Sequence, residues 1–390
     1  MNVSEKIKSF ERSDIKAFAF AFTLFLMTPP YFIWNKLSPL IFIAFCILLS
    51  FRYIKFNAIP KVIFAFFLLL FYVFVGFKEA SNLFGYFSLI GIVSFTLLED
   101  EFLKKVFKNY IFIFSVTMIP SIVSYLLVNI FDVNLPNEII KPLNQFKAND
   151  YILYPFYVQQ NTFIDLILPR FYAYYDEPGV VGTISGVLLM VNGFDLRKKI
   201  NIPILIAGLL SFSFAFYIMM LGYFFVFVKT KYKVIGAIVI ISLLPIISSN
   251  ELLNSYIFSR FEINENGSFT GDNRIVNRNF EGFYDRYSKS DDFYFGLEKK
   301  ASLKYNFGGA SYKDLIVNYG IIPFGTFILL FILYAYNKLQ FRKEFFVYLF
   351  VLWSIIYQRP FITDYYYVFL IFMPIIFLSK KALVRKKVES

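Results

Sequence analysis

The basic residues on one side of the predicted membrane spans are rich in arginine, whereas the basic clusters on the other side are mostly lysine. Lysine suffices to attract anionic headgroups, and arginine is preferred where a planar group must bind phosphate at two points. We expect Arg278 and Arg286 to pair with neighbouring carboxylates. The arginines that we expect to bind a polyprenyl diphosphate or another anionic lipid are Arg170, Arg260, Arg274 and Arg359.

A pair of carboxylates follows Arg170 and precedes a predicted span, in the sequence Asp176-Glu177-Pro178. We expect a carboxylate near the membrane and beside tyrosines to have a raised pKa, which suits a general base. The alternative role for one of the two is to cap the helix that opens at Pro178. We assign catalysis to Glu177, as the base, and to Asp176 beside it.

Two further segments contain residues suited to binding an anion. Arg260 is followed by Gly271-Asp272-Asn273-Arg274, and glycines let such a loop fold back tightly. Small residues at 308–311 lead through Tyr312 into a predicted helix, whose first N–H groups can bind an anion. The alternative is that both are ordinary loops. The residues assigned to diphosphate or glycan binding are Arg170, Arg260, Gly271, Arg274, Tyr312 and Arg359.

The chain has no histidine and a single cysteine, Cys46. The lack of histidine excludes His-ligated zinc, a Ser–His triad and imidazole as a base. One cysteine permits neither an internal disulfide nor a thiolate metal cluster. We therefore expect a reaction without a metal ion or any other cofactor.

The elements that must position these residues are membrane helices. Of the 390 residues, 58% are hydrophobic and only 17% are charged, and the apolar residues form long blocks. This composition predicts an all-α polytopic membrane protein with one transmembrane domain, 1–390. The predicted spans are 16–34, 38–54, 61–77, 82–98, 109–131, 178–194, 202–228, 233–249, 314–336, 344–358 and 365–379.

Block 202–228 decides the number of spans. As one helix it would be about 40 Å long, which exceeds the hydrocarbon layer of about 30 Å. If it turns near Ser211-Phe212-Ser213 and crosses twice, every basic cluster falls on the cytoplasmic side, as the positive-inside rule requires. We therefore predict about twelve transmembrane helices with both termini in the cytoplasm and two long extracytoplasmic loops, 132–177 and 250–313. The net charge of +12 then marks the cytoplasmic leaflet and indicates no nucleic-acid partner.

The order and placement of these motifs resemble those of the O-antigen polymerase (Wzy-type) and ligase superfamily. The stretch from Arg170 to Pro178 is similar to the family's Arg…Glu-Pro motif before a span. Arg260, ten further residues and Gly271 match the spacing of polymerase outer loops, and the run from Ser311 to Ile322 resembles the family's exit into a helix rich in Gly and Ile. The ligases carry a functional histidine near that run, where this chain has Ala310, Ser311 and Tyr312, and this difference favours a polymerase.

The resemblance implies a glycosyltransferase in the bacterial cytoplasmic (inner) membrane, with its active site facing the periplasm or exterior. Its substrates would be undecaprenyl-diphosphate-linked oligosaccharide repeat units of an O-antigen or capsule, and its partners the lipid bilayer, a chain-length regulator and a flippase. Two alternatives remain open: an O-antigen ligase-type transferase, and a polysaccharide flippase or transporter. Charged residues are nearly absent from the middle of the predicted spans, which speaks against transport.

Overall fold

A computed structural model gives the structure of the protein. It describes residues 12–28, 30–33, 39–79, 83–141, 149–161, 169–228, 278–297, 312–358 and 361–389. In this part of the chain the fold is mostly helical, which agrees with the expected all-α membrane protein.

Among the described residues, the first part of the chain contains five α-helices. They are α1 (Arg12–Met27), α2 (Pro39–Ser50), α3 (Ile59–Glu79), α4 (Leu83–Thr96) and α5 (Asp100–Asn129), with short 3-10 turns at Tyr31–Ile33 and Phe51–Tyr53. After a small sheet follow α6 (Pro178–Asn192), α7 (Asn201–Leu210) and α8 (Phe214–Phe227). The remaining described helices are α11 (Arg278–Tyr287), α12 (Asp292–Phe295), α14 (Tyr312–Tyr319), α15 (Ile321–Leu339), α16 (Lys343–Gln358) and α17 (Tyr365–Glu389).

Three described helices are long and apolar enough to cross a membrane, namely those that contain Ile59–Gly76, Asp100–Asn129 and Ile321–Leu339. The other apolar helices are shorter, at 10 to 17 residues. At 1.5 Å per residue such helices are about 15–25 Å long, less than the hydrocarbon layer of about 30 Å. The structure therefore supports a membrane protein, while the predicted number of twelve spans is not confirmed.

The predicted turn within 202–228 is present. Helix α7 ends at Leu210, residues 211–213 form a turn, and α8 begins at Phe214. Both helices pack on α6, whose Gly182 lies against Ser211 and Ser213. The hairpin is confirmed as two helices and a turn.

Helix α6 is packed closely on α8 through two glycines one helical turn apart. A Cβ atom at Gly182 would lie 2.2 Å from the Cβ of Ser213, and one at Gly186 would lie 2.5 Å from the Cε of Met219. Small residues four apart allow helix backbones to approach in this way inside membranes. All residues of α6 except Gly179 are buried, so this helix has no lipid-facing side.

The first long loop contains a three-stranded antiparallel sheet that the sequence analysis did not predict. Its strands are β1 (Glu138–Ile140), β2 (Tyr151–Tyr154) and β3 (Tyr157–Gln160), in the order β1-β2-β3. Strands β2 and β3 form a hairpin around Pro155 and Phe156, with Tyr154 paired to Tyr157. Phe156 has a φ of 61°, and a proline followed by a residue of positive φ is typical of a type II turn.

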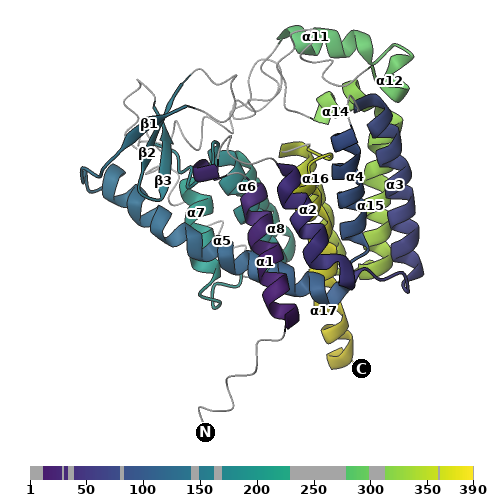
Figure 1. Ribbon diagram of the computed structural model, residues 1–390, viewed down its shortest axis with the longest axis horizontal. Helices are drawn as coiled ribbons and strands as arrows, with labels where there is room; N and C mark the ends of the chain where they lie inside the picture. Colours follow the sequence, from purple (N-terminus) through teal and green to yellow (C-terminus); the bar gives the residue numbers. More distant parts are fainter. Residues whose placement is uncertain are drawn as a thin grey trace.

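The bundle has two different ends (Figure 1). The sheet and helices α11 and α12 lie at one end, which we call the loop end, and the start of α1 and the end of α17 lie at the other, the terminal end. Helix α17 runs through the centre, since it packs against α4, α5, α6, α15 and α16. Its residues from Tyr365 to Ile376 are all buried.

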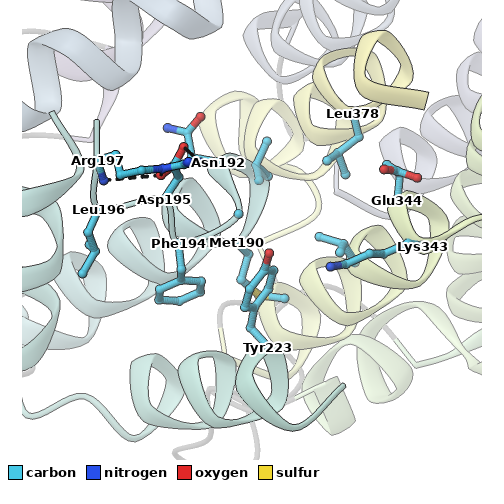
Figure 2. Close-up of a pocket in the computed structure, with 13 residues that line it drawn as sticks. Met190, Asn192, Phe194, Asp195, Leu196, Arg197, Tyr223, Lys343, Glu344 and Leu378 are labelled. Carbon is cyan, nitrogen blue, oxygen red and sulfur yellow. Dashed lines mark hydrogen bonds and ion pairs between the residues drawn. The ribbon is translucent and has the colours of Figure 1, made fainter. Parts of the chain in front are cut away.

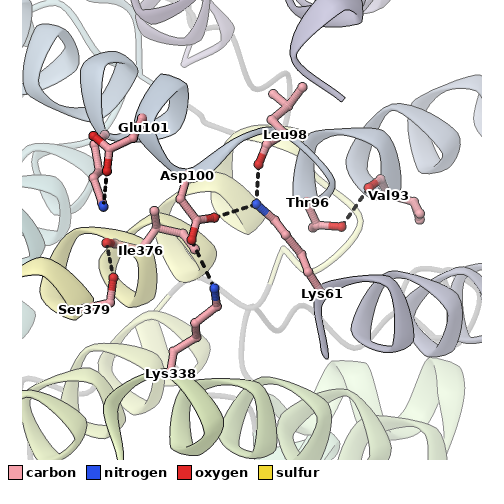
Figure 3. Close-up of polar contacts among 10 residues, drawn as sticks. Lys61, Val93, Thr96, Leu98, Asp100, Glu101, Lys338, Ile376 and Ser379 are labelled. Carbon is pink, nitrogen blue, oxygen red and sulfur yellow. Dashed lines mark hydrogen bonds and ion pairs between the residues drawn. The ribbon is translucent and has the colours of Figure 1, made fainter. Parts of the chain in front are cut away.

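An ion-pair cluster joins three helices at the terminal end (Figure 3). The Asp100 carboxylate accepts hydrogen bonds from the ammonium groups of Lys61 at 2.7 Å and Lys338 at 3.0 Å. Lys61 also donates to the carbonyl oxygen of Leu98. The start of α3, the start of α5 and the end of α15 are thereby fixed to one another.

Candidate functional site

The segment from Pro169 to Glu177 is held by hydrogen bonds from several elements at the loop end. The Tyr125 hydroxyl donates to the carbonyl of Pro169 at 2.7 Å, and the amide of Tyr31 donates to the carbonyl of Tyr174 at 2.8 Å. The five residues from Phe171 to Tyr175 are all buried. This part of the predicted site is therefore a fixed segment seated in the aromatic core.

Arg170 anchors the turn between α7 and α8. Its Nε donates to the carbonyl of Ser211 at 3.1 Å and its Nη2 donates to the carbonyl of Phe212 at 3.3 Å. The two-point geometry that the sequence analysis assigned to phosphate binding is thus used on two backbone carbonyls. The predicted role of Arg170 in diphosphate binding stays a prediction, and the structure gives this residue a positioning role.

The two predicted catalytic carboxylates lie at the start of α6. Glu177 occupies the N-cap position, yet its side chain makes no capping hydrogen bond. The carbonyl of Asp176 accepts a hydrogen bond from the Tyr151 hydroxyl at 2.6 Å. Because Glu177 does not cap the helix, the alternative role considered for it is not supported, and its role as a base stays a prediction.

The tyrosines around this segment remain protonated at neutral pH. Burial raises the pKa of Tyr151, and the neighbouring charges of Asp176 and Glu177 raise it further. Burial, with the hydroxyls of Tyr366 and Tyr174 nearby, likewise raises the pKa of Tyr175 well above its usual value. A proton acceptor at this end is therefore a carboxylate rather than a tyrosinate.

Tyr312 begins α14, where its ring stacks between two other helices. The ring centres of Tyr312 and Tyr357 are 6.2 Å apart, and those of Tyr312 and Phe324 are 6.5 Å apart. Helix α14 is also fixed to the helix pair α11 and α12, which we call the cap, because the Tyr287 hydroxyl donates to the carbonyl of Ile316 at 2.8 Å. The predicted ligand-binding residue Tyr312 thus lies in an aromatic stack at the loop end.

Two glycines let the cap approach α14 and α15 closely. Gly296 has a φ of +76° and Gly320 a φ of +92°, a region that residues with a side chain rarely adopt. A Cβ atom at Gly296 would lie 2.5 Å from the nitrogen of Gly320, and one at Gly320 would lie 2.3 Å from the carbonyl oxygen of Tyr294. The backbone at Gly296 therefore contacts the backbone at Gly320 directly, and this contact sets the position of α14.

Helix α14 carries two buried oxygen atoms without a hydrogen-bond partner, Oδ1 of Asp314 and Oδ1 of Asn318. The two residues are four apart, so their side chains lie next to each other on the helix. Burial raises the pKa of Asp314 to about 7. Paired acceptors of this kind suit a ligand that brings hydroxyl donors, and a carboxylate with such a pKa suits a general base.

The turn between α16 and α17 contributes a third carboxylate. Oδ1 of Asp364 accepts a hydrogen bond from the amide of Tyr366 at 2.9 Å, so Asp364 caps α17. The Asp364 side chain reaches solvent, yet desolvation by the surrounding protein raises its pKa to about 6. The Tyr72 hydroxyl fixes the same turn by donating to the carbonyl of Ile362 at 2.6 Å.

This turn connects the predicted segments. Tyr312 stacks on Tyr357, near the end of α16, and Tyr175 lies close to Tyr366, at the start of α17. Helix α16 packs directly on α6, which follows Glu177. The Arg170–Glu177 segment and α14 are thus arranged around the loop-end tips of α16 and α17. The predicted residues Arg260, Gly271, Arg274 and Arg359 lie outside the described residues.

A groove runs along the sheet at this end. It has a volume of about 310 Å³ and is lined by Tyr31, Pro136, Asn137, Glu138, Leu153, Tyr154 and Pro155. Aromatic faces beside amide and carboxylate groups can stack on sugar rings and accept hydrogen bonds from their hydroxyls. The groove is therefore suited to a glycan chain.

A larger cavity lies at the terminal end, away from these residues (Figure 2). It has a volume of about 950 Å³ between the ends of α6 and α8 and the start of α16. Its charged groups already have partners, since Arg197 pairs with Asp195 at 2.8 Å and Lys343 donates to the carbonyl of Phe227 at 3.0 Å. Size alone does not make it the site of the predicted chemistry.

Sequence reasoning did not assign roles to Asp314, Asn318 and Asp364. A signal for the first two exists, because an acidic and an amide residue four apart flank the apolar run 315–317. Within the described ranges no group of three or more His, Cys, Asp or Glu residues could hold a metal ion. Comparisons of the chain with protein-family models, with curated proteins and with solved structures found no match.

Proposed function

We propose that the protein is a polysaccharide polymerase that joins undecaprenyl-diphosphate-linked repeat units on the outer face of the bacterial cytoplasmic membrane. The observation that carries the proposal is the arrangement around the tips of α16 and α17. There the fixed segment ending in Glu177, the aromatic stack at Tyr312 and the partnerless oxygens of Asp314 and Asn318 occur at one end of the bundle.

The proposed reaction needs few groups. The bond between the anomeric carbon of the growing chain and its lipid diphosphate breaks, and the diphosphate leaves with the bonding electrons. The anomeric carbon bonds to a hydroxyl oxygen of the next lipid-linked unit, whose proton goes to a carboxylate. Glu177 and Asp314 are the candidates for that carboxylate, and cationic groups stabilise the leaving diphosphate.

The groove along the sheet supports a glycan substrate. Tyr31 and Tyr154 present aromatic surface, and Asn137 and Glu138 present polar atoms, at the same end of the bundle as Glu177. A long acceptor or product chain would extend along these residues while its reacting end stays near the membrane.

Reconstitution tests this function. The purified chain in liposomes, supplied with lipid-linked repeat units extracted from cells that lack it, should form a ladder of polymers and release undecaprenyl diphosphate. No nucleotide or metal ion should be needed. Movement of the units across the bilayer without a ladder would instead identify a flippase, and transfer of the glycan to a different acceptor lipid would identify a ligase.

A further inference from the structure

A groove between α3 and α15 opens sideways near the terminal end. Its volume is about 500 Å³. The residues that line it are Pro60, Ile63, Phe64 and Phe67 of α3 and Leu330, Leu333, Tyr334 and Asn337 of α15. Both helices are among those long enough to cross a membrane, so the groove faces the hydrocarbon layer.

The walls and the floor of the groove differ in exposure. Ile63, Phe67 and Leu333 are about half exposed, at 51%, 48% and 54%. Phe64 and Tyr334 form the floor, where both are buried and their ring centres are 4.5 Å apart. The Tyr334 hydroxyl is buried without a hydrogen-bond partner. The apolar groove therefore contains one hydroxyl donor that no group of the described protein accepts from.

Positive charge surrounds the mouth of the groove. The described segments at this end, 50–61, 98–108 and 337–344, contain nine basic and four acidic residues. Lys338 lies one turn beyond Tyr334, with its ammonium group 5.9 Å from the centre of that ring and 3.0 Å from the Asp100 carboxylate (Figure 3). An anionic group at the mouth would therefore be attracted.

Exposed aromatic residues place the mouth at the depth of the membrane interface. Phe56 and Phe341 are largely exposed, and they lie next to the basic residues of segments 50–61 and 337–344. Aromatic side chains favour the boundary between hydrocarbon and headgroups. The groove therefore begins at the level of the lipid headgroups and continues into the acyl-chain region.

We propose that this groove binds one anionic glycerophospholipid of the leaflet at the terminal end. One acyl chain lies between α3 and α15, the phosphate lies near Lys338 and Asn337, and the Tyr334 hydroxyl donates to an ester carbonyl. A zwitterionic lipid offers the same chains without the net charge. The site is independent of the proposed polymerase activity.

Thermal unfolding and native mass spectrometry of the full chain in neutral detergent test the site. Dioleoylphosphatidylglycerol should raise the unfolding midpoint by about 2–4 °C more than dioleoylphosphatidylcholine does, because a ligand that binds only the folded state stabilises it. Mass spectra should show one retained phosphatidylglycerol. Equal midpoints and no retained lipid would overturn the proposal, as would a larger effect from undecaprenyl phosphate.

Two variants of α15 locate the effect. Leu333→Trp fills the groove and should abolish the difference between the two lipids. Leu329→Trp is the matched control, because Leu329 is 53% exposed on the same helix but does not line the groove. It should keep the full difference. Loss of the difference in both variants, or in neither, would overturn the assignment, and Leu333→Phe replaces Leu333→Trp if that variant does not fold.

Discussion

Asp314 is the carboxylate whose surroundings best match the proton transfer in the proposed reaction. Burial keeps its pKa at about 7, and its Oδ1 atom has no partner within the protein. Glu177 lies at the start of a buried helix without capping it. Either Asp314 or Glu177 could therefore accept the proton, and single substitutions distinguish the two.

Asp314→Asn should lower the polymerisation rate by about two to four powers of ten, the usual effect of removing a general base. In the unmodified protein the rate should fall as the pH drops below about 7, because the base must be ionised. A gel ladder timed across pH 5.5 to 8.5, roughly bracketing that pKa, measures both effects.

Asp285→Asn is the control for this substitution, since Asp285 is exposed on the neighbouring helix α11. It should keep the normal rate and the normal pH profile. If instead Glu177→Gln abolishes polymer formation while Asp314→Asn leaves it intact, Glu177 is the base and Asp314 has no part in the proton transfer.

Asp314 should also make stability depend on pH. Its pKa is about 7 in the folded protein and near 3.8 when unfolded, so the folded state binds more protons between these values. The stability contributed by the protonated group is present at low pH and is lost as the pH rises through about 7. Asp314→Asn should raise the unfolding midpoint at pH 8 and leave it unchanged at pH 4, and an equal change at both would contradict the assigned pKa.

The role of Arg170 illustrates a limit of sequence reasoning at this scale. The preference of arginine for two-point binding was recognised, but the sequence cannot distinguish a phosphate from two adjacent carbonyls as the acceptor. Only the tertiary contact of Arg170 with the turn at Ser211 and Phe212 reveals the second possibility.

Arg170→Lys should therefore lower stability as well as activity. A lysine ammonium can reach one of the two carbonyls, and a buried acceptor left without a donor costs about 1–3 kcal/mol. The unfolding midpoint in detergent should fall by several degrees. An unchanged midpoint together with lost polymerisation would show that Arg170 serves the diphosphate and not the turn.

At the scale of elements, the α6–α8 packing depends on the absence of side chains at two positions. Gly182→Val should destabilise the hairpin, because the new Cβ would overlap Ser213 and overpacking costs about 1–3 kcal/mol. Gly325→Val is the matched control, since a Cβ atom there meets nothing within 4 Å. A fall in the unfolding midpoint for both variants alike would contradict this reading of the interface.

The elements also show which features a sequence reveals. The turn at 211–213 was predictable, because the span length and the positions of the basic clusters both required it. The three-stranded sheet was not, since its strands of three or four residues carry no long alternating pattern, and their pairing is fixed by the aromatic residues that they cover. The spacing of Gly182 and Gly186 in α6 is a sequence signal of close helix packing inside a membrane.

At the scale of the whole molecule, the two ends of the bundle should face different compartments. In a Cys46→Ser background, Lys289→Cys at the loop end should react with a membrane-impermeant maleimide in intact spheroplasts. Leu196→Cys, at the terminal end, should react only after lysis; both positions are exposed. The opposite pattern would reverse the topology and place the proposed site in the cytoplasm.

The short helices α6, α7 and α8 have a consequence for the surrounding bilayer. At 15, 10 and 14 residues they are about 22, 15 and 21 Å long, whereas α3 with 21 residues is about 31 Å long. If α7 crosses the bilayer as the predicted topology requires, lipids beside its exposed face would have to compress or tilt to match it, and the membrane would be thinner on this flank than beside α3. A headgroup there lies closer to the midplane, which would lower a lipid-borne sugar toward Glu177. The protein should therefore work faster in vesicles of short-chain than of long-chain phosphatidylcholine.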